Sequence, residues 1–376
     1  MKKAIKTVLF ILLDILLAAA ILCVFSYYHH IRYLWGDVET PTNGGGIVFE
    51  KPEKEENNST NSSEDITIGS EISDSSEIPE NDGYDRSGDF GYKFYDKFLK
   101  EGEEIISTDT AYKSNDISIT LEEVNTTLYY NNKTYDVQYF VYDIYVRNVE
   151  NFYTGANTTR LDFDKLIEKT QTDENLGLTR DFAIAAVNGD YWGNANHTHV
   201  AVRNGELLRY SNYITSDIMV MYYDGTMETI HPQDYNFKKI VAKSPYQIWE
   251  FGPSLLDENG KALKTEDFDA SSYDSHVIGE RNPRCGVGYY EPGHYCFVVV
   301  DGRSSDSMGM RMFQLADVFE ELGCSVAYNM DGGDSSQAYF NGNDIRVDEE
   351  RELAGEAQRK LYDIICIGEV RSNENS

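Results

Sequence analysis

Residues 296–300 read Cys-Phe-Val-Val-Val and residues 324–330 read Cys-Ser-Val-Ala-Tyr-Asn-Met, two apolar runs of strand length. Between them, apolar residues recur at helical spacing until Gly323 ends the pattern. The members of this pattern are Met312, Leu315, Ala316, Phe319 and Leu322. A strand, a helix and a second strand joined so closely predict a right-handed crossover between parallel strands. The carboxyl ends of both strands are then expected at one edge of a sheet.

Each of these apolar runs ends in a polar turn that contains glycine. Asp301-Gly302-Arg303 follows the first run, and residues 331–336, Asp-Gly-Gly-Asp-Ser-Ser, follow the second. A third run, residues 183–187, ends in Asn188-Gly189-Asp190. Such endings bring carboxylates, amides and backbone N–H groups to the sheet edge where open α/β sheets bind ligands. We therefore expect the three endings to build one site.

The sequence from about residue 115 onward is rich in strand patterns. A long hairpin is expected around Asn131-Asn132, and three further pairs mark two-residue hairpin turns. These pairs are Asn204-Gly205, Asp224-Gly225 and Asn341-Gly342. The predicted fold class is α+β, with mixed, strand-rich twisted sheets, one βαβ crossover at about residues 295–330 and a few flanking helices.

The N-terminal segment has the composition of a membrane anchor. Residues 7–28 carry a single charge, Asp14, and lysines precede them at positions 2, 3 and 6. An apolar run of this length spans a bilayer as a helix, and preceding basic residues favour a cytoplasmic N-terminus. The alternative is a cleaved signal peptide, whose apolar region is shorter, about 7–15 residues. We expect an uncleaved single-pass anchor, with the C-terminal domain extracellular on a bacterial cell surface.

Composition divides the chain into three parts. Residues 1–36 are predicted to hold the cytoplasmic tip and the transmembrane anchor. Residues 37–88 are acidic, rich in Ser, Asn and Gly and nearly free of apolar periodicity, so a disordered stalk is expected. Residues 89–376 are expected to form the folded domain. The formal net charge of −31 excludes a nucleic-acid partner, because nucleic-acid binding needs a basic surface.

The sequence predicts no cofactor. The cysteines beyond the anchor are not spaced as metal ligands. His197 and His199 would project to one strand face, yet nothing else completes a convincing ligand set. No metal site is therefore expected, although a divalent cation such as Ca²⁺ stays open as an alternative.

Four blocks of the sequence, taken together, resemble the phosphodiester glycosidase family. They are residues 186–192, Ala-Val-Asn-Gly-Asp-Tyr-Trp, 281–288, Arg-Asn-Pro-Arg-Cys-Gly-Val-Gly, 300–303, Val-Asp-Gly-Arg, and 329–336, Asn-Met-Asp-Gly-Gly-Asp-Ser-Ser. Their order and spacing agree with the family, and the likeness covers about residues 180–368. Asp334 departs from the family's usual glycine and adds a negative charge near the expected site. Cys285-Gly286 replaces the more frequent Thr-Ala, a small-for-small exchange.

The resemblance implies a hydrolase that cleaves the anomeric C1–O bond of a sugar 1-phosphodiester and releases the sugar and a phosphomonoester. The family's known animal member acts on N-acetylglucosamine. Breaking the C1–O bond develops oxocarbenium character, which a carboxylate stabilises or attacks. Asp331 is expected to face the anomeric carbon, with Asp301 as its partner or acid. Arg284 and Arg303 are expected to clamp the phosphate, because a guanidinium holds two phosphate oxygens at once.

Further residues are expected to bind the substrate. Asn188 and Asp190 would bind sugar hydroxyls, and Trp192 or Tyr191 would pack against the sugar ring. A phosphate nest of backbone N–H and hydroxyl groups would comprise Gly332, Gly333, Ser335 and Ser336. Structural roles compete with these interpretations: a tight turn at the two glycines, capping or pairing with Arg303 for Asp301, a turn for Asp190 and a core position for Trp192.

The expected substrate is a surface or cell-wall glycopolymer, such as an exopolysaccharide, that contains sugar-phosphate linkages. Two other functions compete. A non-catalytic envelope protein would use the same cleft to hold anionic glycans. A phosphodiesterase that cuts the P–O bond would want metal ions and a dense His/Asp cluster, which the sequence lacks.

Overall fold

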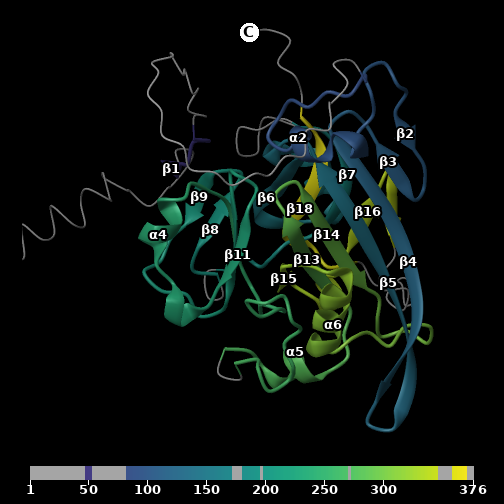
Figure 1. Cartoon of the computed structure of the whole chain (residues 1–376). Coiled ribbons are helices and arrows are strands. Elements are labelled where there is room, and N and C mark those ends of the chain that lie inside the picture. Colours follow the sequence, from purple (N-terminus) through teal and green to yellow (C-terminus); the bar gives the residue numbers. More distant parts are fainter. Residues whose placement is uncertain are drawn as a thin grey trace, which may run out of the picture. The chain divides into compact units, whose positions relative to one another are not determined.

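The structure is a computed structural model that describes residues 47–52, 82–171, 180–194, 198–269, 272–345 and 358–370 (Figure 1). The predicted membrane anchor within residues 1–36 lies outside these ranges, as does most of the predicted stalk. None of the helices in the described ranges has both the length and the apolar character needed to cross a membrane.

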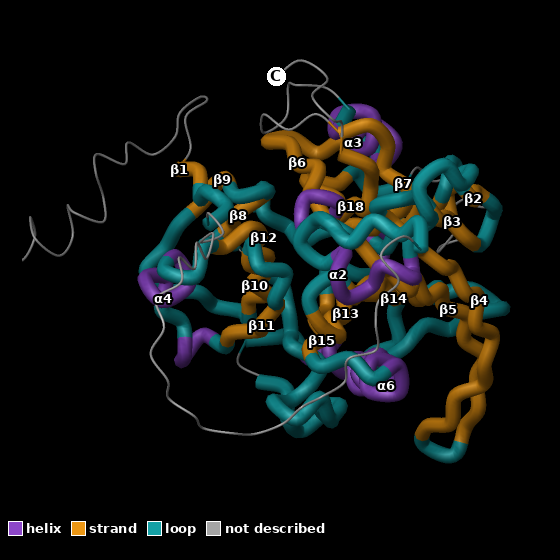
Figure 2. The backbone as a smooth tube through the Cα atoms, turned by 45° about the horizontal axis from the view of Figure 1, so that its top comes forward, coloured by secondary structure: helices purple, strands orange, loops and turns teal. Residues whose placement is uncertain are grey.

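The described strands form three sheets, and the helices are few and short (Figure 2). This architecture confirms the predicted α+β class, but the prediction of mixed sheets is wrong, because every strand pairing among the described residues is antiparallel. The helices are α2 (Gly91–Phe94), α3 (Phe163–Thr170), α4 (Phe237–Val241), α5 (Ser275–Gly279) and α6 (Met312–Leu322). Short 3-10 turns are η2 (Tyr95–Lys97), η3 (Val149–Asn151), η4 (Pro232–Asp234) and η5 (Gly333–Ser335).

A seven-stranded sheet contains the two apolar runs on which the fold prediction depends. Its strand order is β15-β13-β14-β5-β4-β3-β2. The strands are β2 (Ile106–Ser107), β3 (Ala111–Lys113), β4 (Ile117–Tyr130), β5 (Lys133–Val146), β13 (Arg284–Glu291), β14 (His294–Val300) and β15 (Val326–Asn329). β4 and β5 form the long hairpin predicted around Asn131-Asn132, and both asparagines have positive φ, 50° and 62°. Figure 1 shows the end of this hairpin projecting beyond the sheet.

The crossover from β14 to β15 passes through α6 as predicted, but the two strands are not neighbours. β13 lies between them and pairs antiparallel with both. β14 and β15 therefore run in the same direction, and their carboxyl ends lie at one edge. Glycines in β13 let α6 pack closely, because a Cβ on Gly286 or Gly288 would lie only 2.7 or 2.9 Å from the Phe319 ring.

The other two sheets contain six and five strands. The first has the order β1-β9-β8-β12-β10-β11, with β1 (Ile47–Val48), β8 (Ala201–Arg203), β9 (Glu206–Arg209), β10 (Ile218–Tyr222), β11 (Met227–Ile230) and β12 (Pro245–Glu250). The second has the order β17-β16-β7-β18-β6, with β6 (Phe152–Leu161), β7 (Arg180–Asn188), β16 (Ala338–Phe340), β17 (Asn343–Ile345) and β18 (Leu361–Val370). The hairpins predicted at Asn204-Gly205, Asp224-Gly225 and Asn341-Gly342 join β8 to β9, β10 to β11 and β16 to β17.

β1 corrects part of the stalk prediction for residues 37–88. It pairs antiparallel with β9, and Lys51 forms ion pairs with Asp89 (2.6 Å) and Glu150 (3.1 Å). The strand pairing and the ion pairs order residues 47–52 against the domain. An acidic, polar composition therefore did not exclude local structure here.

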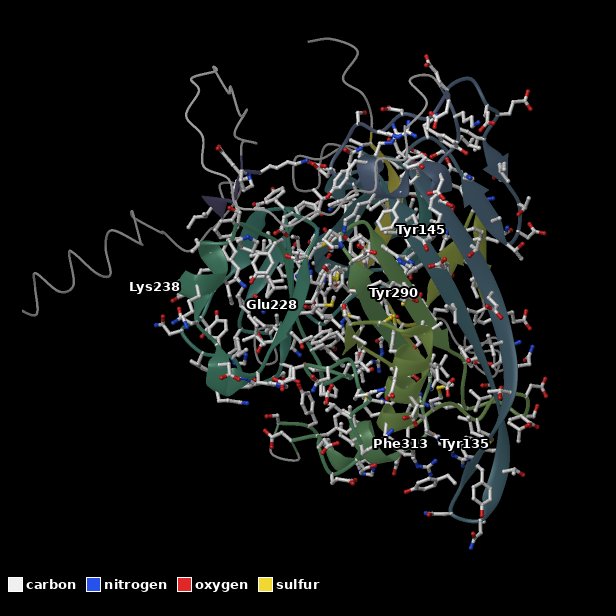
Figure 3. All side chains as sticks on the ribbon, in the orientation of Figure 1. Tyr135, Tyr145, Glu228, Lys238, Tyr290 and Phe313 are labelled. Carbon is white, nitrogen blue, oxygen red and sulfur yellow. The ribbon has the colours of Figure 1, made fainter. Side chains whose placement is uncertain are left out.

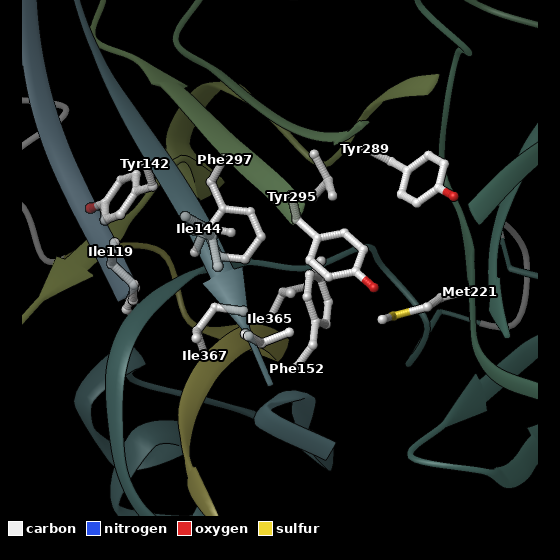
Figure 4. Packing of buried hydrophobic residues seen from close by; sticks show 14 of the residues in the cluster. Ile119, Tyr142, Ile144, Phe152, Met221, Tyr289, Tyr295, Phe297, Ile365 and Ile367 are labelled. Carbon is white, nitrogen blue, oxygen red and sulfur yellow. The ribbon is translucent and has the colours of Figure 1, made fainter. Parts of the chain in front are cut away.

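The largest apolar core lies where the three sheets face one another. Phe297 of β14, Phe152 of β6, Ile365 of β18 and Met221 of β10 meet in it (Figure 4). Each of these four side chains is fully buried. The common core fixes the edges of the sheets relative to one another, and the predicted site residues lie at those edges.

Candidate active site

The predicted site residues begin at one edge of the seven-stranded sheet. β14 ends at Val300 and leads into Asp301, and β15 ends two residues before Asp331. The register places Arg284, the first residue of the intervening strand β13, opposite Val300. The two polar turns therefore leave the sheet on either side of Arg284.

The segment after β15 crosses from the seven-stranded sheet to the five-stranded sheet. Asn188, fully buried at the end of β7, holds this crossing in place. Its Nδ2 donates to the carbonyl of Asp331 (2.6 Å), and its Oδ1 accepts from the N–H of Gln337 (3.3 Å). The amide is thus engaged at both ends, and Asn188 positions the backbone that carries Asp331.

Asp331 is half-buried and hydrogen-bonded within its own turn. Its Oδ1 accepts from the N–H of Gly332 (2.9 Å), and the Ser335 hydroxyl bonds the same carboxylate. Burial raises the pKa of Asp331, while the Ser335 hydroxyl and the positive charge of Arg359 work against that rise. A half-buried carboxyl with a perturbed pKa, next to cationic side chains, is a candidate catalytic group.

Arg303 bridges the two polar turns from a backbone with φ of +65°. Its Nη1 contacts the Asp334 carboxylate (2.5 Å), and its Nη2 donates to Oδ1 of Asn282 (2.9 Å). Gly333 leaves room for this guanidinium, because a Cβ there would lie 2.9 Å from Nη2. The extra charge of Asp334, the departure from the family pattern, is therefore neutralised, and the Arg359 guanidinium contacts it as well (3.3 Å).

Arg284 is a buried cation held by neutral groups. It is 3 % exposed; its Nε donates to the carbonyl of Met310 (3.0 Å), and its Nη2 donates to the carbonyls of Val277 (2.7 Å) and Glu280 (2.9 Å). No carboxylate of the described residues forms an ion pair with it. Burial and the nearby charge of Arg303 lower the pKa of Arg284 to about 10. The Arg284 guanidinium is thus desolvated and is held by three carbonyl groups.

Asp301 lies at the same edge, but its own loop engages its carboxylate. The residue is 4 % exposed, and its Oδ1 accepts from the N–H of Gly302 (2.6 Å). Ser307 donates its hydroxyl to the Asp301 carbonyl (2.7 Å). Gly302 passes tightly beside Pro283, whose nitrogen would lie 2.8 Å from a Cβ. This geometry is compatible with the capping role and with a role beside Asp331.

The four N–H groups of the predicted phosphate nest already have acceptors in the protein. Within the turn, the N–H of Gly332 donates to the Asp331 carboxylate, and those of Ser335 and Ser336 donate to the carbonyls of Gly332 and Gly333. The N–H of Gly333 donates to the carbonyl of Pro283, outside the turn. The turn is the short helix η5, which agrees with the alternative of a tight turn. The hydroxyl groups of Ser335 and Ser336 are not part of these backbone hydrogen bonds. Ser335 Oγ accepts from Arg359 (3.2 Å), and Ser336 Oγ is buried without a partner among the described residues.

Asp190 and Trp192 belong to a buried polar network behind the site. The Asp190 carboxylate pairs with Arg203 (2.7 Å) and accepts from the N–H groups of Trp192 (2.8 Å) and Glu250 (2.9 Å). Arg203 also pairs with Asp363 (3.0 Å), and all three charged side chains are fully buried. Trp192 is 8 % exposed and donates its indole N–H to a backbone carbonyl (3.3 Å). The structure gives both residues supporting positions, and neither contacts Arg284 or Arg303 among the described residues.

Sequence reasoning missed two residues of the site. Arg359 joins it from the residues just before β18 and reaches Asp334 and Ser335. The sequence feature that could have identified Arg359 is the basic pair Arg359-Lys360, which precedes the last apolar strand. Asn282 stands inside one of the four blocks, but nothing in its sequence context showed that it holds Arg303.

No three His, Cys, Asp or Glu side chains gather as a metal site within the described ranges. His199, one of the two histidines considered as ligands, lies 2.9 Å from the Glu250 carboxylate. His197 lies outside the described residues.

Comparison with known proteins identifies one family model and one curated relative that match this chain. The sequence model of a family described as phosphodiester glycosidase matches residues 181–367. The chain is 23 % identical over 270 residues to the SPbeta prophage-derived uncharacterized protein YomE of Bacillus subtilis (strain 168), covering 65 % of this chain and 41 % of that protein. The chain thus spans about two fifths of the length of this curated relative.

A solved structure shares the fold. The zebrafish N-acetylglucosamine-1-phosphodiester alpha-N-acetylglucosaminidase catalytic domain, auto-inhibited by its pro-peptide, superposes with a TM-score of 0.53 and 17 % identity. The match covers 71 % of this chain and 88 % of that one. The family match contains all four sequence blocks and every predicted site residue. Residues 181–367 therefore form a domain of the phosphodiester glycosidase family.

Proposed function

We propose that this protein hydrolyses the anomeric C1–O bond of a sugar 1-phosphodiester and releases the free sugar and a phosphomonoester. One observation carries the proposal: the buried Arg284, without a carboxylate partner in the described chain, lies at the same sheet edge as Asp331. The family match to phosphodiester glycosidases supports the same reaction.

The arginines provide the phosphate site. Arg284 has no counter-ion, and the Arg303 guanidinium, shared with Asp334 and Asn282, lies close enough to lower the pKa of Arg284. A phosphodiester placed between them would satisfy the buried cation with charge-assisted hydrogen bonds. The leaving group departs as a phosphomonoester whose charge the arginines stabilise, so it needs little help from a general acid.

Asp331 provides the carboxylate for the sugar side of the bond. The oxocarbenium character that develops at C1 is stabilised or attacked by an ionised carboxylate, and water completes the hydrolysis. Asn188 and the N–H of Gly332 fix the turn and the carboxylate before the substrate binds. Asp301, on the other side of Arg284, serves as the second carboxyl group.

The substrate proposed is a surface or cell-wall glycopolymer outside the cytoplasm, reached by a domain tethered through the N-terminal apolar segment. The sequence of that segment supports the tether, because residues 7–28 carry one charge over a bilayer-spanning length. N-acetylglucosamine is the first sugar to test, because the fold neighbour from zebrafish is named for it.

An assay of the full chain on methyl α-N-acetylglucosaminyl phosphate tests this function against the alternative of a non-catalytic glycan-binding protein. We expect release of free reducing sugar and methyl phosphate, measured by chromatography. Binding of the diester without any turnover, repeated across diesters of several sugars, would instead favour the binding protein.

Replacing Arg359 by Gln is expected to move the acid limb of the kcat/KM profile to higher pH. The positive charge of Arg359 lowers the pKa of Asp331, so its removal lets burial raise that pKa further. An ionised Asp331 is needed for turnover, and activity is therefore lost at a higher pH as the solution is acidified. The matched control is Lys360→Gln, which removes the same charge one residue away, where the lysine pairs with Asp162 (3.3 Å). Equal profiles for both variants would contradict the assignment of Asp331.

A further inference from the structure

Two arginines and three aromatic rings form a platform beside the proposed active site. We define the arginine–aromatic platform as Arg281, Arg311, Tyr130, Tyr135 and Phe313. We propose that this platform binds the continuing chain of a polymeric sugar phosphate, on the phosphate side of the bond that is cleaved. This inference rests on the proposed function, and it specifies that the substrate is a polymer with several phosphate charges.

The platform is built where the long β4–β5 hairpin passes the start of α6. The Arg311 guanidinium lies 4.0 Å from the ring centroid of Tyr130 and 6.0 Å from that of Tyr135. Arg281 lies 4.7 Å from the Tyr135 ring, and Tyr130 packs against Phe313 with centroids 5.8 Å apart. Figure 3 shows Tyr135 and Phe313 close together at this end of the molecule. All five residues are half-buried, so each keeps some surface in contact with solvent.

The two positive charges of the platform lack carboxylate partners among the described residues. Arg311 donates to the hydroxyl of Tyr135 (3.2 Å), which is neutral, and Arg281 contacts the face of the same ring. The acidic residue next to Arg281 in the chain, Glu280, lies beside His276 instead (2.8 Å). Like charges that share one ring repel each other, and an anion between them relieves the repulsion. Two arginines that share one ring and lack carboxylate partners in the described chain favour an external anion at this place.

The platform is joined directly to the proposed phosphate clamps. Asn282 and Met310 exchange two backbone hydrogen bonds, of 3.1 and 3.0 Å. The same pair holds the clamps: Met310 accepts from Arg284 (3.0 Å), and the Asn282 side chain accepts from Arg303 (2.9 Å). This backbone bridge therefore holds both proposed clamps.

Arg281 and Arg311 flank this bridge in the sequence. Arg281 directly precedes Asn282, and Arg311 directly follows Met310. Consecutive Cα atoms are about 3.8 Å apart, so each platform arginine begins one residue from a residue that holds a clamp. A ligand that leaves the clamps across this bridge meets the platform next.

The chemistry of the platform fits alternating phosphate and sugar units. Guanidinium groups bind phosphate oxygens, and the faces of tyrosine and phenylalanine rings offer apolar surface to the C–H face of a sugar. A lone diester of a small alcohol has no further phosphate or sugar beyond the group held by the clamps. A polymer of sugar phosphates places its next phosphate and sugar beyond them, so the platform would select for substrate length.

The test compares affinity for a polymer with turnover of a monomer, using the full chain. The binding probe is a synthetic tetramer of α-N-acetylglucosamine 1-phosphate, measured by calorimetry in an Asp331→Asn background so that it is not consumed. We expect Arg281→Gln/Arg311→Gln to weaken tetramer binding by at least about tenfold, as expected on loss of charged hydrogen bonds. The charge-matched control is Lys238→Gln/Lys239→Gln on α4, which Figure 3 places across the molecule at Lys238, and it should bind as the parent does.

Monomer turnover separates this inference from the proposed function. With Asp331 intact, the double arginine variant should hydrolyse methyl α-N-acetylglucosaminyl phosphate at the parental rate. Absence of monomer turnover in the parent would count against the proposed function, while the calorimetry would still decide the platform. Equal tetramer affinity of the arginine variant, the lysine variant and the parent, or no tetramer binding by the parent, would overturn the inference. If the double variant melts early by circular dichroism, Arg281→Ala and Arg311→Ala tested singly give the same comparison.

Discussion

Replacing Asp331 by Asn is expected to lower kcat on a sugar 1-phosphodiester by about 10³-fold, within the range of about 10²–10⁴ for a lost catalytic carboxyl group. The amide cannot carry the negative charge that stabilises or attacks the anomeric carbon. Its oxygen can still accept from the N–H of Gly332, so the turn should keep its shape. KM should change little, because the proposed phosphate clamps remain. Steady-state kinetics of the purified full chain measure both constants.

The matched control for this prediction is Asp334→Asn, which removes one carboxylate from the same turn. Asp334 contacts Arg303 and Arg359 and is not the group proposed to face the sugar. Its loss leaves both guanidinium groups freer to bind phosphate, so kcat should stay within about tenfold of the parent, a difference of 1.4 kcal/mol or less. If Asp331→Asn retains the parental rate while Asp301→Asn loses it, the roles of the two carboxyl groups are reversed.

Replacing Arg203 by Met is expected to lower the free energy of unfolding by about 3–5 kcal/mol, the cost of removing one partner from a buried ion pair. Arg203 pairs with Asp190 and Asp363, and all three side chains are fully buried. Burial already raises the pKa of Asp363, and Arg203 works against that rise. Without the arginine, two carboxylates face each other in the interior. Urea unfolding followed by circular dichroism measures the change.

The pH dependence of this loss follows from the same charges. A carboxyl group with a raised folded-state pKa binds more protons in the folded state than in the unfolded state, so it destabilises the fold as pH rises. The stability difference between Arg203→Met and the parent should therefore shrink as pH falls from neutral. The control is Lys165→Met, which removes an exposed ion pair with Glu168 and should cost about 1 kcal/mol or less. A loss no larger for Arg203→Met than for this control would contradict the proposed buried network.

The sequence predicted the parallel directions of β14 and β15 but not the strand between them. Apolar spacing identified α6 and both flanking strands because their residues follow simple helix and strand periods. β13 alternates glycine with larger residues, and its apolar pattern is weak. Gly286 and Gly288 are small because the Phe319 ring of α6 occupies the space beside them. The packing of α6 that explains these glycines is a tertiary contact, which the local sequence of β13 does not reveal.

The site residues also could be predicted only where their position along the chain, and not a tertiary contact, decides their role. Asp331, Asp301 and Arg303 could be predicted together because they lie in the turns that follow β14 and β15. Arg284 was expected only because its sequence block resembles the phosphodiester glycosidase family. Asp190 could not be assigned from sequence, since its turn looks the same whether the carboxylate faces a ligand or a buried arginine. Its partner Arg203 comes from another sheet.

Hydrolysis in ¹⁸O-labelled water tests the central claim most directly, because it reports which bond of the diester breaks. The full chain is incubated with methyl α-N-acetylglucosaminyl phosphate, and the released methyl phosphate is examined by ³¹P NMR for the isotope shift of an oxygen-18 atom. Cleavage between the anomeric carbon and oxygen predicts methyl phosphate without the label. Methyl phosphate or sugar phosphate that carries the label would show attack at phosphorus and would contradict the account.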